Sequence, residues 1–239
     1  MPKTTEYEIN YFPIKRDEVL ESFENIPGAS LLTPNILQKR WIFTIPPEAD
    51  VDALISELKP FVVTGDLDSF KDLLPSGDYL RIRVETSDKT TMSVKIHAKS
   101  GGKMSDQQEA ELMISEYEKP WKILLKNQFL LKNYQENYRE TWQIMDCTAL
   151  IDQWPGLKPH VEIEGKSEEQ VMRLAETLGF TSMESNGEIF STYASVSYIY
   201  AQTFGITQEE MLEVKILTFD KLPAWVKPFP KNNEFKPFA

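Results

Sequence analysis

Six segments of this chain place polar or charged residues two positions apart, with apolar residues between most of them. In a β-strand, residues two apart point to the same face, so each segment predicts a strand with one polar and one apolar face. A slip of one residue would turn every charge to the other face, so this alternation constrains the fold strongly. The polar pairs are Glu6 and Glu8, Arg81 and Arg83, Lys95 and His97, Glu109 and Glu111, Asn137 and Arg139, and Glu162 and Glu164.

Between these strands the sequence carries amphipathic patterns that are typical of helices. We expect helices within residues 15–29, 49–61, 117–129, 166–180, 192–205 and 207–217. Short linkers that contain Gly, Ser and Asp separate several strands, which favours antiparallel pairing. Nothing repeats at a fixed period and no domain boundary stands out, so we expect one α+β domain with a mainly antiparallel sheet.

The shared polar face has two interpretations. It could be the solvated outer face of a plain amphipathic sheet, in which case Glu6 and Glu8 belong to an exposed edge strand. Alternatively, the sheet curls into a barrel with a charged interior, and the two glutamates form half of a metal site. An interior with carboxylates and cations suits a phosphate ligand, because carboxylates hold a divalent metal and Arg and Lys bind phosphate oxygens.

The composition limits the kinds of partner and site that the protein can have. The formal net charge is −11, which argues against a nucleic-acid-coating surface. The only cysteine, Cys147, can form neither an intrachain disulfide nor a cysteine-based zinc site. The sequence shows no long apolar span and "MPKTTEYEIN" is too polar for a signal peptide, so we expect a cytoplasmic protein that binds neither membrane nor nucleic acid.

Several motifs in order resemble one known family. They are "EYEIN", "YLRIR", "SVK", "EAE", "YRETW" and the long block "LIDQWPGLKPHVEIEGKSEEQVMRLAETLGF". This series resembles the CYTH superfamily, the triphosphate tunnel metalloenzymes, over most of the chain from Glu6 to about Tyr200.

The resemblance implies a closed antiparallel β-barrel, or tunnel, of about eight strands with helices packed outside. We expect this tunnel domain to cover residues 1–205. The composition of residues 206–239 predicts a C-terminal helix and a proline-rich aromatic tail, which packs on the domain or extends from it. Family members bind a small-molecule triphosphate with Mg²⁺ or Mn²⁺. They hydrolyse inorganic triphosphate, thiamine triphosphate or nucleoside triphosphates, and a subset cyclises ATP. We expect a monomer or homodimer.

The resemblance also implies roles for individual residues. The metal carboxylates would be Glu6, Glu8, Glu162 and Glu164. The phosphate chain would contact Arg81, Arg83, Lys95 and Arg139. The catalytic set would comprise Glu6, Glu8, Glu111 and Arg139, with Glu109 beside Glu111. Asp146 and Asp152, at expected strand positions, would orient a cation or a metal-bound water.

The sequence departs from the family pattern at three places. Asn10 stands where the family motif has lysine, and Asn137 stands where many relatives have Lys or Arg. The stretch "ASVSYIY" also lacks an expected lysine. Three hypotheses therefore remain: a metal-dependent triphosphatase, a catalytically impaired tunnel module that binds an anionic ligand, and an ATP-cyclising enzyme. The retained glutamates favour the first hypothesis, and Asn10 favours the second.

Overall fold

One large curved sheet organises the chain. A computed structural model describes residues 5–86, 89–97, 103–180, 190–192 and 195–226. Within these residues the strands are β1 (Tyr7–Phe12), β2 (Ser30–Thr44), β3 (Val62–Gly65), β4 (Tyr79–Thr86), β5 (Lys89–Ile96), β6 (Gln108–Ile114), β7 (Leu130–Ile144), β8 (Cys147–Gln153), β9 (His160–Gly165), β10 (Phe190–Thr192) and β11 (Ile216–Leu217). The predicted α+β fold with a mainly antiparallel sheet is confirmed.

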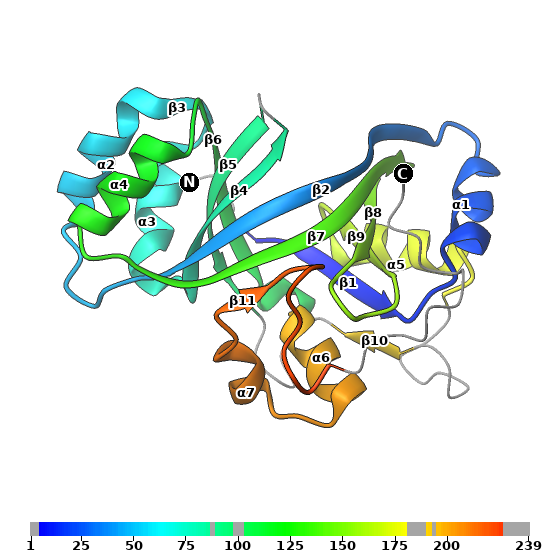
Figure 1. The fold of residues 1–239 in the computed structure, drawn as a ribbon. Helices are drawn as coiled ribbons and strands as arrows, with labels where there is room; N and C mark the ends of the chain where they lie inside the picture. Colours follow the sequence, from blue (N-terminus) through cyan, green and yellow to red (C-terminus); the bar gives the residue numbers. More distant parts are fainter. Residues whose placement is uncertain (1–4, 87–88, 98–102, 181–189, 193–194, 227–239) are drawn as a thin grey trace.

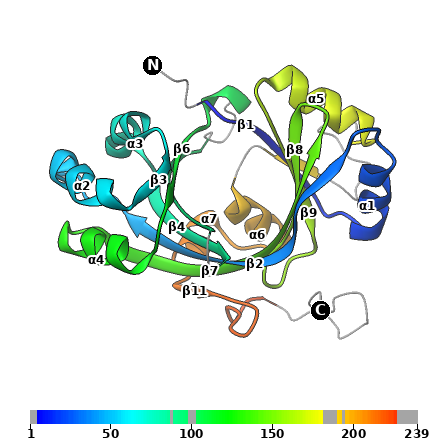
Figure 2. The same cartoon turned by 90° about the horizontal axis from the view of Figure 1, so that it is seen from above.

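The helices lie outside this sheet and at one of its ends. They are α1 (Arg16–Glu24), α2 (Val51–Leu58), α3 (Leu67–Leu73), α4 (Glu118–Lys126), α5 (Glu168–Thr177), α6 (Val196–Phe204) and α7 (Gln208–Leu212), with short 3-10 turns at Lys59–Phe61, Leu74–Ser76 and Met104–Asp106. Helices α1 and α5 cover one side of the curved sheet, α2, α3 and α4 cover the other, and α6 and α7 lie at one end (Figures 1 and 2). Among the described residues, no helix combines the length and the hydrophobicity that a membrane span requires.

The strand order is β10-β1-β9-β8-β7-β2-β4-β5-β6-β3, with β11 attached to β7 as a parallel neighbour. Eight consecutive strands, from β1 to β6 in this order, curve around a central space (Figure 2). The two ends of this run approach each other, because Thr5 bridges Gln108 and the Glu6 N–H donates to the Gln107 carbonyl at 3.0 Å. Between β1 and β6 the described residues form this bridge rather than a ladder, so full closure stays a prediction.

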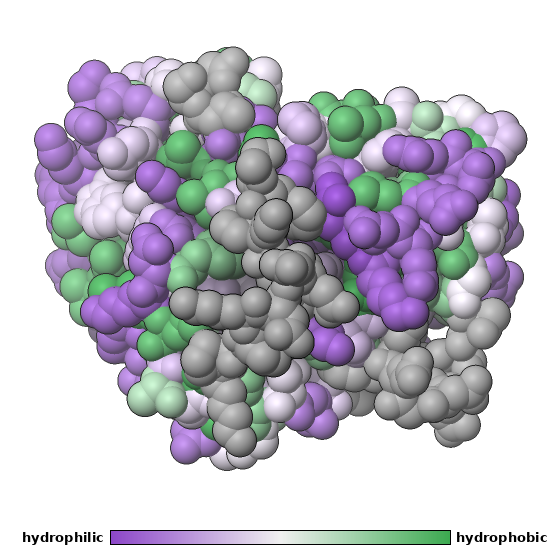
Figure 3. Space-filling model, turned by 45° about the vertical axis from the view of Figure 1, so that its right-hand side comes forward, coloured by the Kyte–Doolittle hydropathy of each residue, from purple (hydrophilic) through white to green (hydrophobic). Residues whose placement is uncertain are grey.

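The apolar residues of the alternating strands pack outward against the helices. Ile9 and Ile163 are fully buried in a cluster with α1 and α5, and Ile82 is fully buried in a second cluster with α2, α3 and α4. Burying each such side chain contributes about 1.5–3 kcal/mol. The polar residues on either side of each isoleucine must then face the inside of the curve. On the face shown in Figure 3, hydrophilic residues cover much of the described outer surface and apolar residues lie between them.

The helix predicted within residues 166–180 is confirmed as α5, and the one predicted at 207–217 is wrong in part. Ser167 caps α5 by accepting a hydrogen bond from the Gln170 N–H, and Gly179 follows the helix with φ of 80°. The expected helix at residues 207–217 is wrong in its second half, because α7 ends at Leu212 and Ile216–Leu217 forms β11. Since β11 pairs with β7, the segment after residue 206 joins the sheet, while the domain boundary at 205 stays a prediction.

Candidate functional site

The concave side of the sheet encloses a cavity of about 1510 Å³. Its lining is dominated by the polar faces of the alternating strands. All nine residues that the sequence assigned to the site contribute to this lining: Glu6, Glu8, Arg81, Arg83, Lys95, Glu111, Arg139, Glu162 and Glu164. The charged side chains therefore gather inside the curve of the sheet, and the solvated outer face is ruled out for them.

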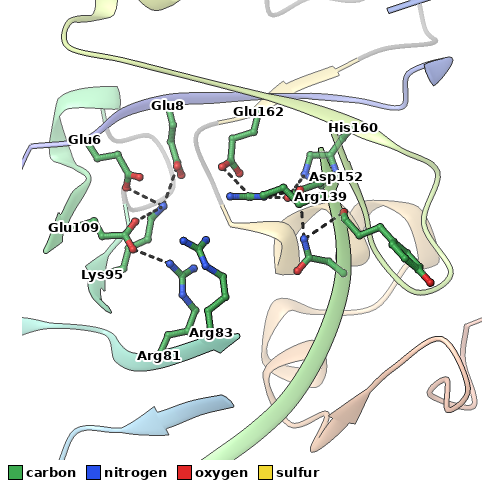
Figure 4. Close-up of polar contacts among 12 residues, drawn as sticks. Glu6, Glu8, Arg81, Arg83, Lys95, Glu109, Arg139, Asp152, His160 and Glu162 are labelled. Carbon is green, nitrogen blue, oxygen red and sulfur yellow. Dashed lines mark hydrogen bonds and ion pairs between the residues drawn. The ribbon is translucent and has the colours of Figure 1, made fainter. Parts of the chain in front are cut away.

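Three glutamates converge on one wall of the cavity. Glu6 precedes β1, Glu8 lies on β1, and Glu164 is the cross-strand partner of Glu8 on β9. One carboxylate oxygen from each lies within 4.8 Å of the others. Lys95 reaches over from β5, and its Nζ lies 2.8 Å from Glu6 Oε2 and 2.9 Å from Glu8 Oε2 (Figure 4).

The surroundings disfavour full ionisation of this acidic cluster. Burial, followed by repulsion from Glu8, raises the pKa of Glu6 well above its ordinary value, against the opposing charge of Lys95. Burial and repulsion from Glu162 likewise raise the pKa of Glu164 well above normal. One ammonium therefore does not neutralise these carboxylates. A divalent cation with a preference for oxygen ligands fits this set, because it would relieve the repulsion.

Glu162 belongs to a second cluster, around Arg139. The guanidinium of Arg139 binds Asp152 through two hydrogen bonds, Nε to Oδ1 at 2.7 Å and Nη2 to Oδ2 at 2.6 Å, and Nη2 also contacts Glu162 Oε1 at 3.1 Å. His160 lies beside this group, with Nε2 3.8 Å from Asp152 Oδ2, and burial lowers the pKa of its imidazole. The four predicted metal carboxylates are thus divided between two clusters, Glu6, Glu8 and Glu164 in one and Glu162 in the other.

A third group of charges comes from β4 and β6. Arg81 donates to Glu109 at 2.8 Å and Arg83 donates to Glu111 at 2.9 Å. Burial alone would raise the pKa of Glu109, but the charges of Arg81, Lys95 and Arg83 lower it well below its usual range. Glu109 is therefore held as a carboxylate by its cations, whereas the side chain of Glu111 is 36% exposed to solvent.

The departures from the family pattern have different surroundings. Asn10 lines the cavity, is 5% exposed, and is the cross-strand partner of Glu162. Asn137 is fully buried and donates to Asp152 Oδ1 at 3.4 Å. The "ASVSYIY" stretch begins just before α6 and contributes Ser195, Val196, Ser197 and Tyr198 to the cavity lining.

The structure places the two predicted aspartates, Asp152 and Asp146, in different surroundings. Asp152 is buried and points toward the cavity, as its predicted strand position requires. The strand position predicted for Asp146 is wrong, because this residue lies in the turn between β7 and β8 with its side chain 70% exposed, 3.6 Å from Arg173.

Sequence reasoning missed Arg40, which lies on β2 and lines the same cavity. Its signal was weak, because Lys39 precedes it directly and the pair does not show the charge-apolar-charge spacing of the other strands. A strand at this position places one set of alternating residues inward, either Gln38, Arg40 and Ile42 or Lys39, Trp41 and Phe43. Testing both sets would have identified Arg40 as a candidate.

Comparisons with known proteins agree with this arrangement. A sequence model of the CYTH domain matches residues 69–188. No curated protein sequence matches the chain. The PH1819 protein from Pyrococcus horikoshii OT3 shares the fold with a TM-score of 0.54 and 16% sequence identity, over 83% of this chain and 99% of that chain. A conserved hypothetical protein from Pyrococcus furiosus has a TM-score of 0.53 and 17% identity, over 74% of this chain and 93% of that chain. A "putative adenylate cyclase" from Vibrio parahaemolyticus has a TM-score of 0.53 and 12% identity, over 77% of this chain and 95% of that chain. The CYTH match covers half of the residues of this chain, so the chain belongs to the CYTH family.

Proposed function

We propose that this protein is a metal-dependent hydrolase that binds a triphosphate, inorganic or organic, in the cavity. The observation that carries the proposal is the combination, in one cavity, of a three-carboxylate cluster with the cations of Arg81, Arg83, Lys95 and Arg139. A triphosphate needs a divalent metal and several cationic donors to balance its charge. The curved sheet would then act as the tunnel around the ligand, closed by the contact between Thr5 and Gln108.

Glu6, Glu8 and Glu164 would hold the metal, Mg²⁺ or Mn²⁺. Glu162 lies two residues before Glu164 on β9 and also lines the cavity, so it flanks this cluster. When bound, the metal supplies charge neutralisation at the phosphate oxygens. Lys95, which now contacts Glu6 and Glu8, would be free to turn toward the phosphate chain once those carboxylates hold a metal.

The cations would position the phosphate chain, and a carboxylate would manage the proton. Arg81, Arg83, Lys95 and Arg139 would bind non-bridging oxygens, which fixes the chain for in-line attack. A water oxygen attacks the terminal phosphorus, the anhydride P–O bond breaks, and the leaving phosphate oxygen takes the bonding electron pair. Glu111 is suited to accept the water proton, because it lines the cavity and keeps solvent access.

A specific observation favours a second candidate, a tunnel-fold module that binds an anionic ligand without turnover. Asn10 supplies no cation beside Glu162, and Arg139 is already bound by two carboxylates, Asp152 and Glu162. Both features weaken the hold on a triphosphate. ATP cyclisation is a third candidate. Its support is the fold shared with the Vibrio parahaemolyticus structure, which is described as a "putative adenylate cyclase".

One experiment separates these candidates. Phosphate release is measured from tripolyphosphate, thiamine triphosphate and ATP, each with Mg²⁺ and with Mn²⁺, and cyclic AMP is assayed in the ATP reactions. We expect metal-dependent phosphate release by the wild type and none by Glu8→Gln. Saturable binding without release would favour the module, cyclic AMP would favour the cyclase, and neither binding nor turnover would overturn the proposal.

A further inference from the structure

Arg40 differs from the other guanidinium groups that line the cavity. Arg81, Arg83 and Arg139 each contact at least one carboxylate at 2.9 Å or closer. In the part of the chain that the structure describes, no carboxylate oxygen lies within 4.0 Å of the guanidinium nitrogens of Arg40. Its Nε is buried without a hydrogen-bond partner, as are the Nε atoms of Arg81 and Arg83, so the missing ion pair is what sets Arg40 apart. Arg40 is nevertheless only 7% exposed.

The neighbours of Arg40 make its charge unfavourable in the free protein. It is the cross-strand partner of Arg83 on β4, and like charges directly opposite each other in a sheet repel. Burial, together with the charges of Arg81, Arg139 and Arg83, lowers the pKa of Arg40 to about 9. Two interactions act in the other direction: the ring of Trp154, whose centroid lies 4.9 Å from Cζ, and the charge of Asp152, which lies beyond ion-pair distance.

Packing on Trp154 could in principle be the whole role of this side chain. A cation over an aromatic ring gains modestly, whereas a buried charge without a counter-ion is costly. An uncharged side chain of similar length would fill the same space without this cost. The position therefore favours an anion at ion-pair distance, which no carboxylate of the described residues provides.

We propose that Arg40 is an additional phosphate-binding residue, which contacts non-bridging oxygens of the triphosphate together with its neighbour Arg83. This inference rests on the proposed function of the same cavity. It gives a reason for the unmatched guanidinium, because the bound anion completes its ion pair. It also supplies a cation on β2 where Asn10 leaves none on β1.

The test is binding of tripolyphosphate to the full chain, measured by calorimetry with and without Mg²⁺, for the wild type, Arg40→Gln and Arg40→Lys. A charge-assisted hydrogen bond of about 1.5–3 kcal/mol corresponds to a loss of roughly 10- to 150-fold in affinity for Arg40→Gln. Arg40→Lys keeps the charge and should lose less. Lys39→Gln is the matched control, since it removes the same charge from the exposed neighbouring position and should leave the affinity unchanged.

Thermal melting of the same proteins without ligand provides the second readout. Because Arg40→Gln removes an unmatched buried charge, its melting temperature should equal or exceed that of the wild type, and it should gain less than the wild type when tripolyphosphate is added. A wild type that binds tripolyphosphate with the same affinity as Arg40→Gln would overturn this inference and leave the proposed function standing. A wild type that does not bind tripolyphosphate would overturn both.

Discussion

At the scale of single residues, Asn10 is the position where a substitution should improve the site. Its side chain is buried on β1, lines the cavity and faces Glu162 across the β1–β9 pair. We expect Asn10→Lys to tighten tripolyphosphate binding by about tenfold or more, because a charge-assisted contact contributes about 1.5–3 kcal/mol. Calorimetry measures the affinity, and phosphate release shows whether turnover rises with it.

The matched control for this change is Asn10→Met, which has similar length and no charge. If the added ammonium is what matters, only the lysine variant gains affinity. Equal affinities for wild type, Asn10→Lys and Asn10→Met would show that position 10 does not reach the phosphate chain.

Two glutamates of the cavity should respond to pH with opposite signs. Burial and Glu162 raise the pKa of Glu164, so its native carboxyl holds its proton longer than in the unfolded chain, and the stability it contributes is lost as pH rises through the raised pKa. Glu164→Gln mimics the protonated form, so without metal its melting temperature should rise relative to wild type as pH increases from about 4 upward.

Glu109 supplies the opposite case. Although burial opposes it, Arg81 and Lys95 lower the pKa of Glu109, so the stability it contributes is present above the unfolded pKa and is lost only at lower pH. Glu109→Gln should therefore lower the melting temperature at neutral pH, and the difference from wild type should shrink on acidification. Melting curves from about pH 2.5 to 8 for both variants check the pair, because the contribution of Glu109 is lost below its unfolded pKa. The same sign for both variants would contradict this account.

At the scale of elements, the strands with charge-apolar alternation were predictable, and the irregular ones were not. β4, β6 and β9 contain the polar pairs predicted for them, because each has one face on helices and one on the cavity. β5 contains Lys95 but ends at Ile96, before its predicted partner His97. The first half of β2 contains Pro34 and two register shifts against β7, so it carries no simple period. Helix α3 and strand β3 were not predicted, since each is short and depends on its packing against β6.

β3 also shows how a flanking element supports the site. Gly65 ends this strand with φ of +119°, and a Cβ there would lie 2.7 Å from the Glu111 carbonyl oxygen of β6. We expect Gly65→Ala to lower the free energy of unfolding by more than about 1 kcal/mol, through both the backbone strain and the displacement of β6. Urea unfolding measures the change.

Gly179, at the end of α5, is the control for Gly65. It also has positive φ, but a Cβ there meets nothing within 4 Å, so Gly179→Ala pays only the conformational strain. The loss should be smaller than at Gly65. Equal losses would indicate that the contact with β6 does not matter.

At the scale of the whole molecule, the direction of the charged faces was predictable, and the pairing of the charges was not. The helices cover the apolar side, so the nine predicted residues had to share the inside of the sheet. Which carboxylate meets which cation depends on strands far apart in sequence, such as β1 and β5 at Lys95. The resemblance implied that Glu162 holds the metal, whereas in the fold its carboxylate contacts Arg139 at 3.1 Å.

The stability of the whole fold should depend on divalent metal. An ion that binds only the folded state adds about 2.7 kcal/mol at a concentration about 100 times its Kd. Glu6, Glu8 and Glu164 come from β9 and the start of β1, and Lys95 connects them to β5, so an ion at this cluster would stabilise the region where the two ends of the curved run of strands meet. We therefore expect millimolar Mg²⁺ or Mn²⁺ to raise the melting temperature of the wild type.

The double variant Glu8→Gln with Glu164→Gln should lose this shift. Glu57 is paired with Lys126 away from the cavity, so the control Glu57→Gln should retain it. Equal metal-induced shifts in all three proteins would place the ion elsewhere, and no shift in the wild type would contradict a metal site at these carboxylates.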